Sequence, residues 1–185
     1  ITWERGTTWD IGAEMKFLNN CLNIEGDLFY HKRTDMLIPR NASLPETAGI
    51  TLPLENLGEM ENKGFDALIS WNDKIGKVEY ELGLNMSYAR NKILFWDETP
   101  GIPEYQKSTG KPVPTSGTLA NLINRAGLYY KTDGVFNTQE ELDNYPHWAG
   151  ARLGDIKFVD YNNDGKINAD DRVRSDKNQT PRLVT

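Results

Sequence analysis

The strongest constraint on this chain is an alternation of apolar and polar residues that persists over strand-length runs. Between Thr8 and Phe17 every second residue is apolar. The apolar positions are Trp9, Ile11, Ala13, Met15 and Phe17, and the positions between them are Asp10, Gly12, Glu14 and Lys16. A period of two places successive side chains on opposite faces of a β-strand. The run therefore predicts a strand with one apolar and one polar face.

Three further runs repeat this alternation in the first half of the chain. They lie at 22–31, 63–71 and 78–88. Asn19 and Asn20 separate the first two runs, and Asn tolerates the positive φ that tight hairpin turns require. The segment 72–76 is expected to be the short turn between the last two. The pattern predicts an all-β, antiparallel fold made of two hairpins.

The length of these runs fits a membrane barrel as well as a soluble sheet. Each has about the nine to eleven residues that a tilted strand needs to cross a bilayer. Aromatic residues lie near the run ends, where the girdles of a barrel would lie: Trp9, Phe17, Tyr30 and Trp71. A soluble sheet with one face on a core shows the same alternation. Four strands also cannot close a barrel, since the smallest use about eight.

Composition excludes several classes of protein. No stretch approaches the roughly 18 consecutive apolar residues of a membrane helix. A net charge of -6 argues against a nucleic-acid partner. Cys21 is the only cysteine, so a disulfide framework is excluded. His31 and His147 lie in no recognisable nucleophile or metal motif, and we expect the protein not to be an enzyme.

A long loop is expected after about residue 95. Its Pro and Gly density is high and it is too long for an ordinary connection. A capping box, Thr138-Gln139-Glu140-Glu141, predicts a short helix at 138–145 that Pro146 stops. Three aromatic residues in or beside the loop could stack on sugar rings, or could equally pack the loop against itself: Trp96, Tyr105 and Trp148.

The sharpest chemical motif is the segment 160–171, which matches a calcium loop of the EF-hand type. Oxygen-bearing side chains occupy the first, third, fifth, ninth and twelfth positions, with Gly165 at the sixth. The predicted Ca²⁺ ligands are Asp160, Asn162, Asp164, Lys166 (through its backbone carbonyl), Asn168 and Asp171. Calcium prefers about six to eight oxygen ligands, and this spacing wraps them around one point. The alternative is an Asp/Asn/Gly-rich turn that binds no metal.

Two details separate this motif from a calcium sensor. Its last ligand is Asp171, shorter than the usual Glu, and the segment that follows is not an amphipathic helix. The motif is therefore similar to the loop of dockerin modules without their helices, and any Ca²⁺ would be structural. Ile167 is expected to anchor it in apolar packing.

The run Asn56-Leu57-Gly58-Glu59-Met60-Glu61-Asn62-Lys63-Gly64-Phe65-Asp66 strongly resembles a signature of the SusC/RagA family of TonB-dependent outer-membrane transporters. Two other segments resemble the same family in the same order. They are Trp3-Glu4 with 7–12 and 17–20, and Gly154-Asp155-Ile156-Lys157-Phe158-Val159-Asp160. The resemblance spans nearly the whole chain.

This resemblance implies a segment from the later part of a plugged barrel in the bacterial outer membrane, as found in Bacteroidota. Residues 1–95 would supply four transmembrane strands, and 96–185 a long extracellular loop that leads to the next strand. TonB, ExbB and ExbD would energise import of oligosaccharides or peptides, through an N-terminal part outside this chain. A SusD-like surface lipoprotein would cap the barrel. The alternative is a soluble, calcium-stabilised β-sheet module that binds glycans.

The resemblance also orients the strands. The face with Ile11 and Leu84 would contact outer-membrane lipid. Four acidic residues would face the barrel lumen: Glu14, Asp27, Glu79 and Glu81. The segment alone is not expected to transport anything.

Overall fold

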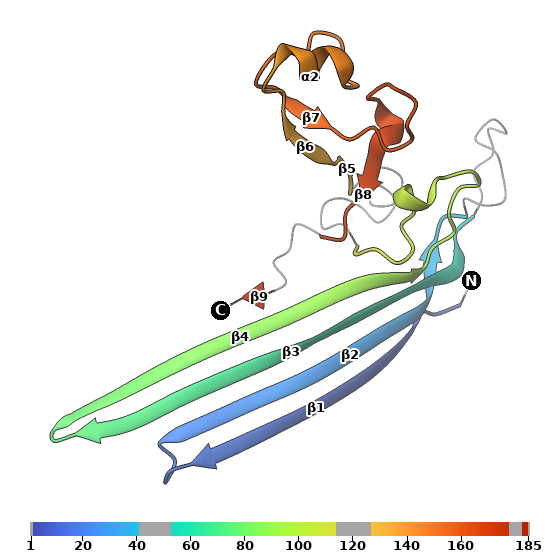
Figure 1. Ribbon diagram of the computed structural model, residues 1–185. Helices are drawn as coiled ribbons and strands as arrows, with labels where there is room; N and C mark the ends of the chain where they lie inside the picture. The colour runs from blue at the N-terminus through green and yellow to red at the C-terminus, as the bar shows by residue number, and fades with distance from the viewer. Residues whose placement is uncertain (1, 41–52, 114–126, 178–182, 185) are drawn as a thin grey trace.

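The computed structural model describes residues 2–40, 53–113, 127–177 and 183–184 (Figure 1). Four long antiparallel strands dominate it and lie side by side as one curved sheet. They are β1 (Arg5–Phe17), β2 (Leu22–Ile38), β3 (Glu55–Ile75) and β4 (Val78–Phe95). The predicted all-β, antiparallel class is confirmed.

The strands are longer than the alternating runs that predicted them. β3 has 21 residues and extends well beyond 63–71 at both ends. Pairing continues where the side-chain alternation stops, with β2 over 55–58 and with β4 over 72–75, and the strand continues with it. Side-chain pattern therefore located the strands but underestimated their length.

The two hairpin turns differ in how well the sequence predicted them. Leu18, Asn19 and Asn20 have positive φ of 53°, 54° and 69°, as expected for the first turn. The second turn is shorter than the predicted 72–76, because β3 continues to Ile75 opposite Val78. Only Gly76, with φ of 65°, and Lys77 lie between the strands. The predicted extent was wrong.

The register of the strands brings the apolar faces of all four runs together. Met15, Ile24, Ile69 and Leu84 form one row across the sheet. Further apolar rows are Ile11–Leu28–Phe65–Tyr88, Ala13–Gly26–Ala67–Met86 and Phe17–Leu22–Trp71–Leu82. This face stays exposed: the exposed fractions of Trp9, Ile11 and Leu82 are 66%, 69% and 65%. The described residues therefore provide no core for it.

The opposite face is polar. Glu14 lies opposite Glu25, Asp27 opposite Asp66, and Glu81 opposite Asn72. Glu79 shares this face and its carboxylate accepts a hydrogen bond from Lys74 Nζ at 2.8 Å. The register thus places Glu14, Asp27, Glu79 and Glu81 on one side of the sheet, as the alternation predicted.

A small core lies where the sheet meets the long loop. It contains Met36, Ile38, Ile93 and Trp96, with Met60 and Val113 packed against it. The loop folds back at this point, because Ile93 exchanges backbone hydrogen bonds with Gly110 and Lys111. The end of the four-stranded sheet and the start of the long loop therefore pack together in this core.

The rest of the loop contains short elements. They are η2 (Glu104–Gln106), β5 (Leu128–Tyr130), β6 (Thr132–Val135), α2 (Gln139–Asn144), β7 (Ile156–Phe158), η3 (Ala169–Asp171) and β8 (Arg172–Arg174). β5 pairs with β8 and β6 with β7, so the loop has two small sheets of its own. β9 (Leu183–Val184) pairs with Ser87 and Tyr88 of β4 and so joins the edge of the large sheet.

The predicted short helix is confirmed. α2 begins after Thr138, whose Oγ1 accepts a hydrogen bond from the backbone N–H of Glu141 at 3.2 Å. The Glu141 carboxylate in turn accepts one from the Asn137 N–H at 2.9 Å. Within the described part of the chain, no helix has the length and apolar character needed to cross a membrane.

Candidate functional site

The segment 160–171 turns as the calcium-loop pattern predicts. Asn163 and Gly165 have positive φ of 58° and 79°, which reverses the chain sharply. The Asp160 carboxylate accepts hydrogen bonds from the backbone N–H groups of Asp164 and Gly165, at 3.2 and 2.8 Å. The first acidic residue therefore lies inside the turn.

Asp164, the middle acidic residue of the loop, is hydrogen-bonded to neighbouring amides. The Asp164 carboxylate accepts hydrogen bonds from the side-chain amides of Asn162 (3.0 Å) and Asn168 (3.3 Å), and from the Lys166 N–H (2.8 Å). The Asn162 amide and the Lys166 N–H lower the pKa of Asp164, because they stabilise its charged form. Three of the predicted ligand side chains are thus in direct contact.

The last acidic residue closes the loop. Asp171 is fully buried, and its two oxygens accept hydrogen bonds from the N–H groups of Tyr161 (2.8 Å) and Asn168 (2.7 Å). Backbone amides therefore hold this carboxylate. Ile167 is buried, as predicted.

Among the residues that the structure describes, no three His, Cys, Asp or Glu side chains converge as a metal site would require. The loop is prefolded by its own amides, and Ca²⁺ binding there stays a prediction.

The loop 160–171 is hydrogen-bonded to the segment that follows β4. Tyr105 Oη and Gln106 Nε2 donate to the Asp170 carbonyl at 3.0 and 2.9 Å. The Tyr105 ring also packs on Tyr161, with centroids 4.9 Å apart. Burial, and then the negative charge of Asp171, raise the pKa of the Tyr105 phenol.

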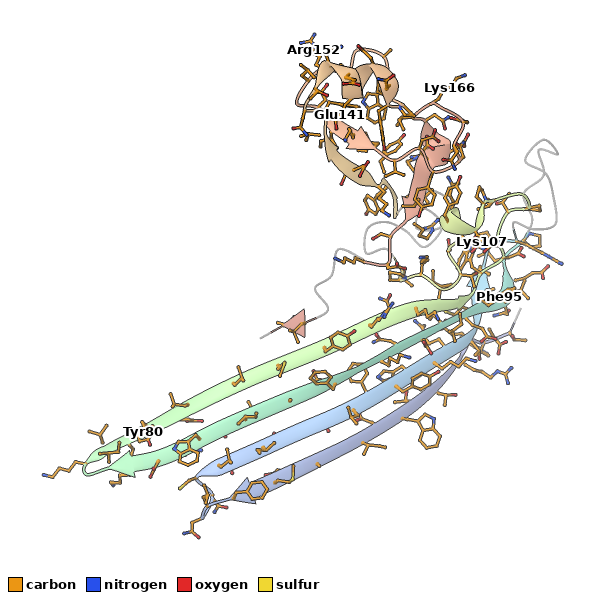
Figure 2. The ribbon with its side chains drawn as sticks, viewed as in Figure 1. Tyr80, Phe95, Lys107, Glu141, Arg152 and Lys166 are labelled. Atoms are coloured by element: carbon orange, nitrogen blue, oxygen red, sulfur yellow. The ribbon has the colours of Figure 1, made fainter. Side chains whose placement is uncertain are left out.

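The three aromatic candidates occupy three different places. Trp96 is 6% exposed and belongs to the small core, and Tyr105 packs on Tyr161. Trp148 is 40% exposed and packs against Tyr130 and Phe158, at 5.4 and 4.7 Å between centroids. The structure does not bring the three together. Figure 2 shows this loop region, with Glu141 and Lys166, at the opposite end of the molecule from Tyr80.

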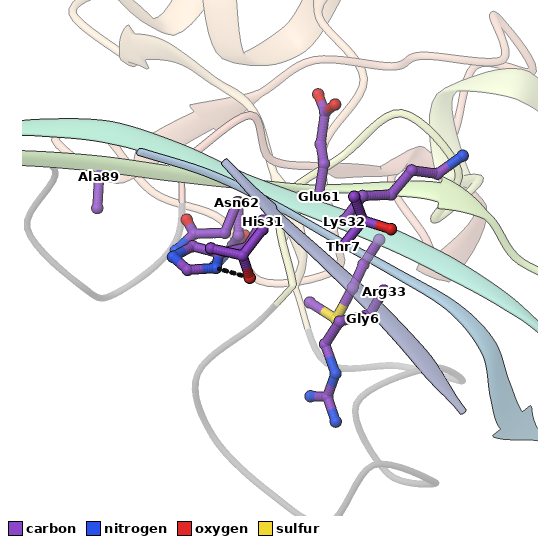
Figure 3. Close-up of a pocket in the computed structure, with 11 residues that line it drawn as sticks. Gly6, Thr7, His31, Lys32, Arg33, Glu61, Asn62 and Ala89 are labelled. Atoms are coloured by element: carbon purple, nitrogen blue, oxygen red, sulfur yellow. Dashed lines mark hydrogen bonds between the residues drawn. The ribbon is translucent and has the colours of Figure 1, made fainter. Parts of the chain in front are cut away.

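A hollow of about 620 Å³ lies on the polar face of the sheet. It borders the small core, because Met60 lines the hollow and also packs against that core. Figure 3 shows His31 and Asn62 side by side on this face, whereas Lys32 and Glu61 extend to the other side. Thr8 Oγ1 lies 3.0 Å from His31 Nδ1. Only the register shows that Thr8, His31 and Asn62 are neighbours across three strands.

Comparisons with known proteins identify the fold. The family model described as TonB dependent receptor-like, beta-barrel matches residues 1–181. TonB-dependent receptor P26 of Formosa agariphila is 28% identical and aligns with 94% of this chain. TonB-dependent receptor SusC of Bacteroides thetaiotaomicron is 22% identical over 93% of the chain. The chain spans only 17% and 16% of the lengths of these two relatives.

The fold also matches solved structures. The RagAB peptide transporter matches 99% of this chain and 19% of its own, with a TM-score of 0.59 and 20% identity. The RagAB peptide importer in its open-open state gives a TM-score of 0.60 at 19% identity, over 99% of this chain and 18% of its own. The chain therefore belongs to the TonB-dependent receptor-like β-barrel family of outer-membrane proteins, which are not enzymes, and its sheet is part of a barrel wall.

Proposed function

We propose that this chain is part of a TonB-dependent outer-membrane importer of oligosaccharides or peptides that works with a SusD-like surface lipoprotein. The observation that carries the proposal is the exposed apolar face, aligned across four strands by their register. A soluble glycan-binding module would need to cover that face with its own core. A lipid-facing wall needs no such cover.

The dimensions of the apolar face support a bilayer. From Trp9 to Phe17 the strand advances about 27 Å at roughly 3.4 Å per residue, which a tilt of about 40° shortens to about 21 Å. Trp9 pairs with Tyr30 at one end of this band, and Phe17 shares a row with Trp71 at the other. Each end of the band thus has two aromatic residues, where the girdles of a membrane barrel would lie.

In this arrangement the loop after Phe95 is extracellular. Trp148 and Tyr105 would lie there as candidate contacts for substrate, whereas Trp96 is buried in the small core. Energy would come from TonB, ExbB and ExbD through a part of the protein outside this chain. Transport belongs to the whole receptor.

Uptake in the native bacterium tests this proposal. Deleting the gene, or tonB, is expected to abolish growth on one oligosaccharide or peptide mixture, and re-expression should restore it. A surface lipoprotein should co-purify with the full-length receptor. Unchanged growth of both deletion strains on every such nutrient would refute the importer.

We also propose a structural Ca²⁺ in the loop 160–171. The support is the positive-φ turn at Asn163 and Gly165, the inward Asp160 carboxylate and the contacts of Asp164 with Asn162 and Asn168. Asp160, Asn162, Asp164, Asn168, Asp171 and the Lys166 carbonyl would hold the ion, which would supply positive charge at the centre of the turn.

Metal analysis of the full-length protein tests the calcium proposal. We expect bound Ca²⁺ in the wild type and its loss in Asp160→Asn, with Asp143→Asn on α2 as the matched control. Hydrogen exchange at 160–171 should rise after chelation. An equally protected loop with and without chelator would contradict a structural ion.

A further inference from the structure

The hollow on the polar face is lined by a continuous row of hydrogen-bonding side chains. The register pairs Thr8 with His31, His31 with Asn62, and Asn62 with Asn91. His31, Asn62 and Asn91 are half-buried, and all four residues line the hollow. Four strands thus contribute one polar group each to the same strip.

Each group in this row both donates and accepts hydrogen bonds. A Thr hydroxyl and an Asn amide do so always, and an imidazole does so in its neutral form. Sugar hydroxyls have the same double capacity. Thr8 Oγ1 lies 3.0 Å from His31 Nδ1, and Asn91 Oδ1 accepts a hydrogen bond from the Val113 N–H at 2.9 Å. The Asn62 amide, the Asn91 amide N–H groups and His31 Nε2 are therefore the donors and acceptors that the row offers to a ligand hydroxyl. A strip of this kind suits a ligand with many hydroxyls.

The charged groups near the row are already paired. Arg33 forms an ion pair with Glu4, and Lys32 forms one with Glu59 at 2.9 Å. Lys32 and Glu61 also extend to the far side of the sheet (Figure 3). The row therefore offers a charged peptide no unpaired Lys, Arg or Glu among the described residues that line the hollow, whereas a neutral ligand needs no opposite charge.

Apolar surface borders the polar strip. The Phe29 ring lies 5.6 Å from the His31 ring, and Met60 and Ala89 line the hollow. Sugar rings carry apolar C–H faces beside their hydroxyls, and these pack on aromatic and aliphatic groups. The combination of strip and border matches both sides of a pyranose ring.

We propose that the row Thr8–His31–Asn62–Asn91 is a binding subsite for a neutral oligosaccharide on the lumen side of the barrel wall. The proposal rests on the importer function and specifies its substrate class. The row lies close to the loop end of the wall, so it would meet the substrate early in its passage through the barrel.

Calorimetry on the full-length receptor in detergent tests this subsite. The probes are maltoheptaose, cellohexaose, mannohexaose and a tryptic digest of casein. Asn62→Ala and His31→Ala are each expected to weaken binding of one neutral oligosaccharide by at least about tenfold. Asn85→Ala is the matched control, because Asn85 lies on the same face of β4 beside Leu68, away from the hollow.

The possible outcomes distinguish a failure of the subsite proposal from a failure of the importer proposal. Equal affinity in Asn62→Ala, His31→Ala and Asn85→Ala overturns the subsite, as does binding of the casein digest alone or of no probe. TonB-dependent growth could persist in each of these cases, and the importer would then stand without the subsite. The gel mobility of unheated and heated samples checks that each variant has folded.

Discussion

Several residues of the family signature have a visible structural reason at their positions. Gly64 lies where two neighbours approach closely: a Cβ there would lie 1.9 Å from the Tyr88 carbonyl oxygen and 2.6 Å from Phe29 Cζ. Asn56 exchanges hydrogen bonds with both backbone groups of Thr2 and donates a third to the Asp35 carbonyl. Asp35 has φ of 58° within an irregular stretch of β2, so Asn56 bridges a gap that strand pairing leaves.

Gly64→Ala is expected to destabilise the barrel, because the added methyl group overlaps the backbone of β4. Overpacking of this kind costs about 1–3 kcal/mol or more. The measurement is the urea midpoint of the full-length protein, read from the gel mobility of the folded form. Gly83→Ala is the control, since a Cβ at Gly83 meets nothing within 4 Å. Equal midpoints for the two variants would contradict the close-approach explanation.

Glu141 should make the cap of α2 sensitive to acid. The Asn137 N–H and then Lys157 lower its pKa, outweighing the opposing effect of burial. A carboxylate with a lowered folded-state pKa stabilises the fold above its unfolded value near 4.5, and this contribution is lost as pH falls through the folded value. Hydrogen exchange of 139–144, corrected for intrinsic rates, should therefore lose protection in acid.

Glu141→Gln is expected to remove most of this pH dependence and to lower the protection at neutral pH. Glu140→Gln is the control, because the Glu140 carboxylate bonds to none of the described residues. The cap explanation fails if the two variants show the same pH profile.

At the scale of elements, the two faces of each long strand differ in polarity, and we expect them to contact different environments. Leu84 and Asn85 are adjacent on β4 but belong to opposite faces, beside Ile69 and Leu68 respectively. Leu84 is 51% exposed, although it is apolar and lies in the middle of the apolar band. Such an exposed apolar side chain is expected to contact membrane lipid.

Leu84→Lys is therefore expected to impair assembly in the outer membrane, while Asn85→Lys is tolerated. A Lys on the lipid face near the bilayer midplane costs about 2–4 kcal/mol, and the lumen face has no such penalty. The measurement is the amount of folded full-length receptor in outer-membrane fractions. Equal amounts of the two variants would refute the assignment of faces, and the same comparison can be made with Ile11 and Glu81.

At the scale of the molecule, the chain leaves the wall after Phe95 and returns to it at β9, beside Ser87 and Tyr88. The loop and the two tight turns lie at opposite ends of the sheet (Figure 1). A membrane around the sheet would thus separate the loop from Gly76 and Lys77.

Surface labelling tests this topology. In a cysteine-free full-length receptor, Lys166→Cys in the loop should react with an impermeant maleimide on intact cells. Lys77→Cys in the tight turn should react only after the outer membrane is permeabilised. The reverse pattern would invert the receptor, and labelling of both in intact cells would exclude a membrane-spanning sheet.

Much of this fold was predictable because its causes are local. Alternation within 8–17 specifies a two-faced strand, paired Asn residues specify a turn, and Thr138 with Glu141 specifies the start of α2. Each of these signals depends on neighbours a few residues away. The turn at Gly76 was predicted too long because strand ends depend on the partner strand as well.

What the sequence by itself determined is the two-faced character of the strands, the loop helix and the order of acidic and amide groups along 160–171. The tertiary structure decided the rest. It aligned the four apolar faces into one exposed apolar surface, buried Trp96 in the small core and assembled Thr8, His31, Asn62 and Asn91 into a row. The physical reason is that cross-strand register joins residues far apart in the chain, and a shift by one residue would move each side chain to the other face.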